Sequence, residues 1–262
     1  MFEGCDKWKN GCGSCPQKRK YSWLFDRSAE LYQRKRKAFS GVDLTIITPS
    51  QWLADQVKQS FLKTCPVKVI RNGIDLEIFK PTDGNFRERY HIPTEKYILL
   101  GVAHGWSVRK GLDVFVELAQ RLDSQKFQIV LVGTDEIIDR QLPENIISIH
   151  RTNNQQELAE IYSAADLFVN PTREDNYPTV NLEAIACGTP VLTFRTGGSP
   201  ESLTEKTGCV VDCGDIDVME QGILRIREQM PYSRKECLES AKRFDKNNCY
   251  SAYLDLYGVA HK

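Results

Sequence analysis

The chain has 262 residues, of which 41% are hydrophobic, so it is long enough for one large domain or two small ones with buried cores. Its formal net charge is zero, and we expect no nucleic-acid partner. No apolar run approaches the roughly 18–20 residues of a membrane-spanning helix, and the first residues lack the apolar core of a secretory signal. We therefore expect a soluble, cytoplasmic protein.

The first 40 residues carry an uneven share of the charge and a group of cysteines. Ten Lys and Arg residues stand there against four acids, so the segment is about +6. A solvated helix face is the simpler interpretation, and peripheral contact with an anionic membrane surface or lipid is the functional one. Cys5, Cys12 and Cys15 follow a C-x6-C-x2-C spacing that suits zinc in its CxxC half, but no fourth ligand is evident. We expect reduced thiols and keep a metal site as the weaker alternative.

The region before residue 97 is predicted to contain little sheet. Two strands and two helices bury little apolar surface, and an open sheet edge is a liability. We therefore expect residues 1–88 to be the truncated tail of a larger sheet domain together with its linker. The predicted elements are helices at 26–39 and 51–62, the latter with Ser50 as its N-cap, and strands at 44–50 and 67–75.

From residue 97 onward, short apolar runs alternate with longer amphipathic stretches. Such runs are typical of strands covered on both faces, and strand–helix repetition gives a parallel sheet with right-handed crossovers. We therefore predict an α/β fold with a Rossmann-like parallel sheet over 89–241, which would bind ligands at the carboxyl ends of its strands. The predicted strands are 97–103, 127–133, 146–150, 166–172, 190–194 and 208–212, with helices at 111–122 and 156–165.

The first of these strands leads into a loop that is rich in cations. Arg109 and Lys110 precede Gly111, which opens a helix. A cation beside a helix N-terminus suits an anion, because free backbone amides and the helix dipole both favour negative charge. The alternative is a pair of solvated surface charges.

The fourth predicted strand is followed by acidic residues and then by a helix from about Thr179. Asp175 would lie in the loop at the mouth of that helix, and Glu183 in its first or second turn among apolar neighbours. A carboxylate there suits a ribose diol, which offers two hydroxyl donors. The simpler alternative is an acid that only solubilises the helix.

The next loop, at 195–203, contains Gly197 and Gly198. Paired glycines allow either close approach to a ligand or a plain turn, and both interpretations remain open. Residues 199–201 look like a cap followed by a first helical turn.

These residues together resemble the family 4 retaining glycosyltransferases of the GT-B fold. The most specific segment is ED-N-Y-P…LEA-ACGTPV, in which Asp175 stands eight residues before Glu183. The other matching segments are TPS at 48–50, NGID…FKP at 72–81, RKG at 109–111 and FDKNNCYSAYLDLY at 244–257. The resemblance implies two facing Rossmann-like domains, with most of the first, acceptor-side domain missing from this sequence and a C-terminal helix within 242–262 returning to it.

By the same resemblance, Asp175 matches the first acid of an E-x7-E pattern and contacts the donor sugar, Glu183 binds the ribose, and Lys110 binds the diphosphate. We take Asp175 and Lys110 as the catalytic residues. The further donor-binding residues are Arg109, His104, Asn176, Tyr177, Thr179 and Val180. The sequence departs from the family where Asp175 replaces a Glu and where His104 stands in place of an Arg.

The resemblance implies transfer of a sugar, with retention of configuration, from a UDP- or GDP-sugar to a glycan or lipid-linked acceptor in surface polysaccharide synthesis. We expect no cofactor besides this donor and no metal, because preorganised cations and amides can stabilise the leaving diphosphate. Two alternatives remain: a non-catalytic nucleotide-sugar-binding remnant, and a nucleotide-sugar epimerase. The spacing of the two acids argues against the epimerase.

Overall fold

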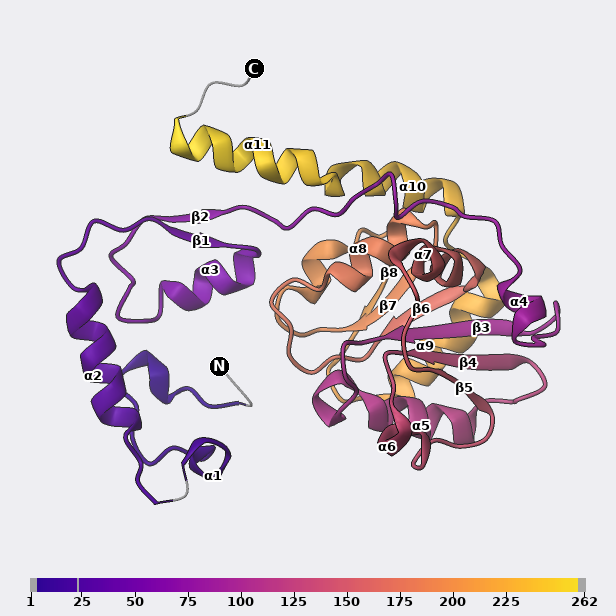
Figure 1. The fold of residues 1–262 in the computed structure, drawn as a ribbon, viewed down its shortest axis with the longest axis horizontal. Coiled ribbons are helices and arrows are strands. Elements are labelled where there is room, and N and C mark those ends of the chain that lie inside the picture. Colours follow the sequence, from indigo (N-terminus) through magenta and orange to yellow (C-terminus); the bar gives the residue numbers. More distant parts are fainter. Residues whose placement is uncertain (1–3, 23, 259–262) are drawn as a thin grey trace. The chain divides into compact units, whose positions relative to one another are not determined.

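The computed structural model describes residues 4–22 and 24–258 and divides into two compact units, Met1–Arg71 and Asn72–Lys262 (Figure 1). Residues 1–3 and 259–262, the outer ends of the predicted segments 1–88 and 242–262, lie outside the described residues. The division comes earlier than residue 88 because the segment after Arg71 packs into the second unit. Ile74, Phe79 and Phe86 of that segment are buried in one of its apolar cores.

The second unit contains a sheet of six parallel strands in the order β5-β4-β3-β6-β7-β8. This confirms the predicted α/β fold, and each of the six predicted apolar runs contains one strand. The strands are β3 (Tyr97–Val102), β4 (Phe127–Val132), β5 (Ile146–Ile149), β6 (Leu167–Asn170), β7 (Val191–Phe194) and β8 (Gly208–Val211).

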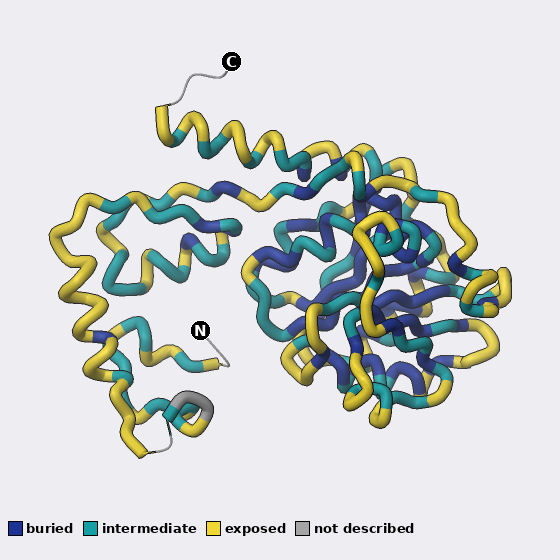
Figure 2. Tube along the Cα trace, viewed as in Figure 1, coloured by how far each residue is buried: buried dark blue, intermediate teal, exposed yellow. Residues whose placement is uncertain are grey.

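Helices cover both faces of this sheet (Figure 1). Leu99 of β3 shares a core with Phe115 of α5, whereas Ile98 and Leu100 share the opposite core with Leu182 of α8. The middle of the sheet is consequently buried, as Figure 2 shows. The helices are α5 (Leu112–Arg121) and α9 (Ile216–Gln229) on one face and α7 (Gln155–Ala164), α8 (Thr179–Ala186) and α10 (Arg234–Ala241) on the other, with the short α4 (Phe86–Arg89) and α6 (Glu136–Asp139) between strands.

The pairing of β3 with β6 is the point at which the strand order reverses. α5 follows β3 onto one face, and α8 follows β6 onto the other. The loops that leave these strands therefore diverge, and open parallel sheets bind their ligands in the crevice that results. Lys110 follows β3, and Asp175 and Glu183 follow β6, so the predicted residues stand at this position.

A buried network of polar side chains joins α8 to the strands beside it and to the 3₁₀ helix η3 (Ser199–Ser202). Asn170 donates to Asn181 Oδ1 at 2.7 Å. The amide nitrogen of Asn181 donates to the hydroxyls of Ser199 at 3.1 Å and Ser202 at 3.0 Å. Because buried polar groups need partners, this network fixes the start of α8 relative to η3.

Residues 244–246, where the C-terminal helix begins, are hydrogen-bonded to the start of the second unit. The predicted helix at 244–257 is found as the 3₁₀ helix η4 (Lys242–Phe244) followed by α11 (Lys246–Tyr257). Ile74 N–H donates to Phe244 O at 2.8 Å, and Lys246 N–H donates to Ile74 O at 2.9 Å. The Lys246 ammonium also pairs with Asp75. Among its described residues, α11 has none that is fully buried.

The first unit contains a two-stranded parallel sheet and helices. Ser50 accepts a hydrogen bond from Leu53 N–H at 3.1 Å, which confirms the predicted N-cap. The helix predicted to reach residue 62 ends earlier, at Val57, and the chain continues in turns in which both the N–H and the hydroxyl of Ser60 donate to Val57 O. The elements are β1 (Ile46–Thr48), β2 (Val67–Val69), α1 (Lys18–Tyr21), α2 (Ser28–Phe39), α3 (Gln51–Val57) and the 3₁₀ helix η1 (Lys7–Lys9).

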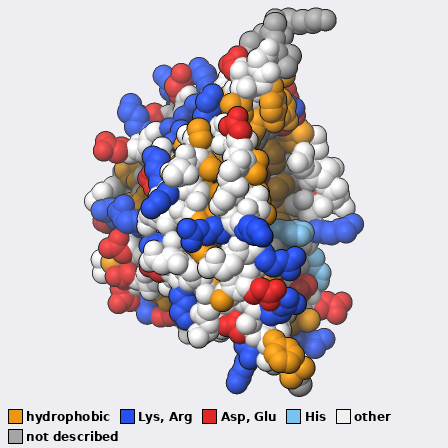
Figure 3. All heavy atoms as spheres, turned by 90° about the vertical axis from the view of Figure 1, so that its left-hand side faces the viewer, with side chains coloured by type: hydrophobic (Ala, Val, Ile, Leu, Met, Phe, Trp, Pro, Cys, Tyr) orange, Lys and Arg blue, Asp and Glu red, His pale blue; other side chains and the backbone are white. Residues whose placement is uncertain are grey.

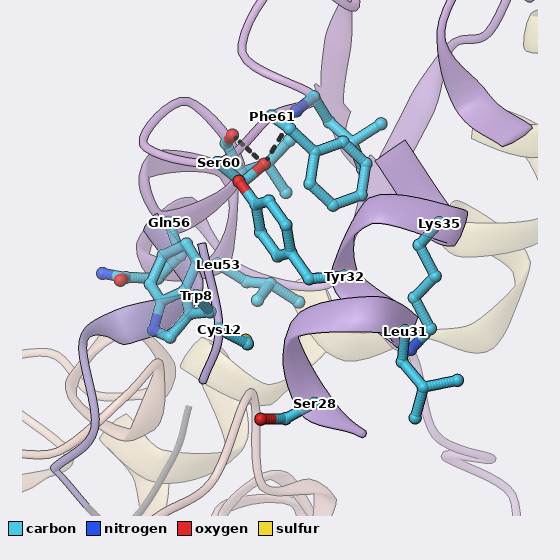
Figure 4. Close-up of a pocket in the computed structure, with 12 residues that line it drawn as sticks. Trp8, Cys12, Ser28, Leu31, Tyr32, Lys35, Leu53, Gln56, Ser60 and Phe61 are labelled. Carbon is cyan, nitrogen blue, oxygen red and sulfur yellow. Dashed lines mark hydrogen bonds between the residues drawn. The ribbon is translucent and has the colours of Figure 1, made fainter. Parts of the chain in front are cut away.

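A cavity of about 430 Å³ lies within the first unit between α2 and α3 (Figure 4). Tyr32 and Phe61 meet edge to face in its wall, with ring centroids 5.4 Å apart. The other lining residues include Trp8, Cys12, Leu31, Lys35 and Leu53. None of the predicted donor-binding residues lines it.

Basic side chains of α2 are solvent-exposed, in keeping with a solvated helix face. On the face drawn in Figure 3, Lys and Arg side chains are interspersed with acidic and uncharged ones rather than gathered in a single patch. Within the part of the chain that the structure describes, no helix is both long and apolar enough to span a membrane. Contact of the basic segment with a membrane surface stays a prediction.

Replacing Asn181 by Ala is expected to lower the free energy of unfolding by about 2–4 kcal/mol, because Asn170, Ser199 and Ser202 would each lose a partner while staying buried. Urea unfolding followed by tryptophan fluorescence measures this change. Asn248→Ala, an exposed substitution in α11, is the control and should stay within about 0.5 kcal/mol of the native protein. Equal midpoints for the two variants would contradict the prediction.

Candidate functional site

Gly111 sets the path of the chain between the 3₁₀ helix η2 (Val108–Lys110) and α5. Its φ is +82°, and a Cβ there would lie 2.5 Å from both Cγ and the carbonyl oxygen of Pro171, directly after β6. Glycine tolerates both the backbone conformation and the contact. At the other end of the loop, the indole of buried Trp106 donates to a carbonyl at the end of β4 at 3.0 Å. The loop is thereby held against the carboxyl end of β6, and Lys110 with it.

Lys110 and Asp175 meet at this edge of the sheet although they are 65 residues apart in the sequence. Lys110 Nζ donates to Asp175 Oδ2 at 2.7 Å, and the two side chains are 27% and 22% exposed. The sequence predicted both residues as parts of the site, on two different loops. Their contact brings a cation and a carboxylate together at the switch point of the sheet.

Arg173 is a residue of this site region that sequence reasoning missed. Its guanidinium binds the Asp113 carboxylate in a bidentate manner, at 2.8 and 2.7 Å. Its backbone N–H donates to Arg109 O at 2.9 Å, so it joins the loop after β3 to the loop after β6. The available signal was its place directly after the strand, in the segment with Asp175, but its partner lies 60 residues away.

The paired glycines hold the backbone of Asp175. Gly197 has φ +52°, and a Cβ there would lie 1.7 Å from the carbonyl oxygen of Asp175. Gly198 N–H donates to the same oxygen at 3.2 Å. The glycines therefore permit close approach of one loop to another, and the predicted helical turn after them is the 3₁₀ helix η3.

Glu183 lies in α8, partly buried, with its carboxylate held by two hydroxyl groups. The Tyr162 hydroxyl donates to Glu183 Oε2 at 3.0 Å, and the Thr179 hydroxyl also hydrogen-bonds the carboxylate. Burial raises the pKa of Glu183, and the two hydrogen bonds counter part of that rise. Glu183 is thus a packed acid with specific partners, not a solubilising one.

The other predicted donor-binding residues lie on the same loops and at the helix start. The N–H groups of a first helical turn have no partner within the helix, so the start of α8 can face an anion. His104, Arg109 and Asn176 are exposed, Tyr177 is 4% exposed, and Thr179 and Val180 are the first two residues of α8.

The site therefore offers two kinds of chemistry at one sheet edge. Lys110 and the start of α8 favour an anionic group. The carboxylates of Asp175 and Glu183 accept hydrogen bonds from hydroxyls. A ligand that carries both a phosphate and sugar hydroxyls matches this combination.

No group of three or more His, Cys, Asp or Glu side chains within 4–22 and 24–258 is arranged to hold a metal ion. Cys5, Cys12 and Cys15 are free thiols. Burial and then the neighbouring Cys5 and Cys15 raise the pKa of Cys12, which favours its protonated form at neutral pH.

Residues 96–229, just over half of the chain, match the sequence profile of the family described as Glycosyl transferases group 1. A D-inositol 3-phosphate glycosyltransferase of Corynebacterium jeikeium is 29% identical over 69% of this chain and 48% of its own length. A sulfoquinovosyl transferase of Arabidopsis thaliana is 23% identical over 89% of this chain and 49% of its own length. The chain thus spans about half the length of these curated relatives.

Solved structures share the fold. A sucrose-phosphate synthase from Thermosynechococcus elongatus has a TM-score of 0.75 and 24% identity, over 91% of this chain and 64% of that one. An Anabaena protein solved in complex with UDP-glucose has a TM-score of 0.72 and 16% identity, over 88% of this chain and 68% of that one.

Glu183→Gln tests the burial of this acid through the pH dependence of stability. Burial raises the folded-state pKa of Glu183 above its unfolded value. Its contribution to stability is therefore complete below the unfolded pKa and is lost as the pH rises through the folded pKa. The neutral glutamine avoids this loss, so the stability of the variant relative to the native protein should rise as the pH increases from about 4, the ordinary pKa of a glutamate, through the raised folded-state pKa.

Urea unfolding of both proteins at a series of pH values measures this difference. The exposed Glu228→Gln in α9 is the control, and its difference from the native protein should stay nearly constant. If the difference in unfolding free energy between Glu183→Gln and the native protein does not change with pH, or changes in the opposite direction, the carboxyl is not buried as described.

Proposed function

The chain belongs to the family described as Glycosyl transferases group 1, and from this premise we propose that its second unit binds a nucleotide sugar, with a UDP- or GDP-sugar as donor. We further propose that the full activity is transfer of that sugar, with retention of configuration, to a glycan or lipid-linked acceptor in surface polysaccharide synthesis. The observation that carries the proposal is the convergence of Lys110, Asp175 and the start of α8 at the switch point between β3 and β6.

Each group of the site has a counterpart in such a donor. Lys110 and the N–H groups of Thr179 and Val180 would bind the diphosphate. Glu183 would accept hydrogen bonds from the ribose diol, and Asp175 from hydroxyls of the donor sugar. The UDP-glucose bound by the Anabaena protein of similar fold supports this class of ligand.

The same groups suit the chemistry of transfer. Cleavage of the glycosyl–phosphate bond leaves negative charge on the nucleoside diphosphate. A fixed cation and preorganised amides stabilise that charge as it develops. We assign no enzyme nucleophile and therefore no covalent sugar intermediate.

The acceptor is assigned only by class. The two curated relatives, of whose length this chain spans about half, are named a D-inositol 3-phosphate glycosyltransferase and a sulfoquinovosyl transferase. The first name specifies no sugar and the second no acceptor, so they support a glycosyltransferase without selecting one substrate for this chain.

Calorimetric titration with UDP-, GDP- and ADP-sugars is the first test of donor binding. We expect one base to bind with a Kd on the order of micromolar to tens of micromolar. Glu183→Ala should weaken that binding about tenfold or more, because it removes the charged acceptor for the ribose hydroxyls. Glu228→Ala, an exposed change in α9, is the matched control and should bind as the native protein does.

The outcomes separate the competing functions. Absence of binding by a folded sample, or full affinity in Glu183→Ala, would refute the donor site. Binding without hydrolysis of the nucleotide sugar and without transfer to added acceptors would favour the non-catalytic binding protein over the enzyme.

Lys110→Met tests the assignment of the diphosphate. Loss of the cation should weaken binding of a nucleoside diphosphate about tenfold to a hundredfold and that of the monophosphate less, because Lys110 is assigned to the diphosphate. Lys126→Met, just before β4 at the opposite edge of the sheet, should leave both affinities unchanged. Equal losses of affinity for the diphosphate and the monophosphate would contradict the assignment.

A further inference from the structure

Tyr162 is a fully buried tyrosine in α7 whose ring has little freedom. It lies between Phe79, in the segment that opens the second unit, and Phe168 of β6, edge-on to both, with ring centroids 6.4 and 5.5 Å away. Its carbonyl accepts a hydrogen bond from the Thr189 hydroxyl at 2.6 Å. Ring and backbone are therefore both fixed, and the position of the hydroxyl follows from them.

This hydroxyl reaches the proposed donor site. It donates to Glu183 Oε2 at 3.0 Å, from a different helix than the one that carries Glu183. Thr179, four residues before Glu183 in α8, supplies a second hydroxyl to the same carboxylate. Packing between Phe79 and Phe168 would be served equally well by phenylalanine, so the hydroxyl is the feature that needs an explanation.

We infer that Tyr162 is a positioning residue: its hydroxyl fixes the Glu183 carboxylate in the direction of the ribose diol of the donor. This inference rests on the proposed function. Tyr162 is itself fully buried, so it would act through Glu183 and not by contact with the ligand.

Two consequences follow from this arrangement. The hydroxyls of Tyr162 and Thr179 stabilise the ionised form of the carboxylate, which accepts hydrogen bonds only, and so counter part of the pKa rise that burial causes. The carboxylate is also kept in one rotamer, so a ligand diol meets a preorganised acceptor and no side chain has to be immobilised on binding. Both effects concern the diol alone and should not extend to the base or the phosphates.

Tyr162→Phe removes the hydroxyl and keeps the ring contacts. The first readout needs no ligand: ¹³C NMR titration of carboxyl-labelled glutamate, with the Glu183 signal assigned by its loss in Glu183→Gln. Loss of a donor to the ionised form should raise the pKa of Glu183 above its native value. Cys187, also near this carboxyl, has a pKa raised to about 12 chiefly by burial, so it stays neutral throughout the titration.

The second readout compares UDP with 2′,3′-dideoxy-UDP, or the corresponding pair for whichever base the native protein binds. Tyr162→Phe should weaken the ribonucleotide about tenfold and the dideoxynucleotide less than about twofold. In a Glu183→Gln background the same substitution should have little further effect on this ratio. Tyr97→Phe is the matched control, because the Tyr97 hydroxyl donates to the Asp166 carbonyl at 3.4 Å and not to Glu183.

Each outcome decides a separate point. A raised Glu183 pKa with selective loss of the diol-bearing nucleotide supports the positioning role. An unchanged titration, or equal weakening of both nucleotides, overturns it and leaves a structural role for the hydroxyl. If the native protein binds no nucleotide, the proposed function fails, and the titration alone still shows whether Tyr162 controls the carboxylate.

Discussion

The site depends on the parallel pairing of β3 with β6. On either side of that pair the chain adds strands in opposite directions, so α5 and α8 must cover opposite faces of the sheet. The loops diverge where they leave the two strands, so contacts between loops are needed to bring the site residues together. Gly111 against Pro171, and Gly197 against the backbone of Asp175, are contacts that no larger residue could make without a shift. The first contact holds the loop after β3 against the loop after β6, and the second, from the loop after β7, fixes the backbone of Asp175, so that Lys110 and Asp175 can pair.

Much of the fold of the second unit could be predicted because its strands are buried on both faces of the sheet. Strands covered on both faces need continuous apolar runs, and these stand out in the sequence between turn residues. In the first unit that signal is weak. Only residues 67–69 of the predicted strand 67–75 pair with β1, and the helix after Ser50 ends at Val57, because local hydroxyl and backbone contacts decide its end.

The candidate site could be predicted in its parts but not in its connections. Lys110, Asp175 and Glu183 were found because they follow strands and match a spaced motif. Tyr162 and Arg173 were not, because their partners lie 21 and 60 residues away and neither type stands out at its position. Tyr162 looks like any aromatic residue on the apolar face of a helix. Pairwise contacts between distant segments are a property of the fold, and no local pattern encodes them.

The two carboxylates of the site are held in different ways, and this difference has consequences for the proposed function. Asp175 pairs with Lys110, so its charge is compensated by a cation while both side chains keep partial exposure. In the proposed complex, a diphosphate would compete with Asp175 for Lys110. Glu183 loses water and gains two neutral hydroxyls instead of a cation, so its charge stays only partly compensated. In the proposed complex, hydrogen bonds from the ribose diol would complete that compensation and so offset the desolvation of the carboxylate.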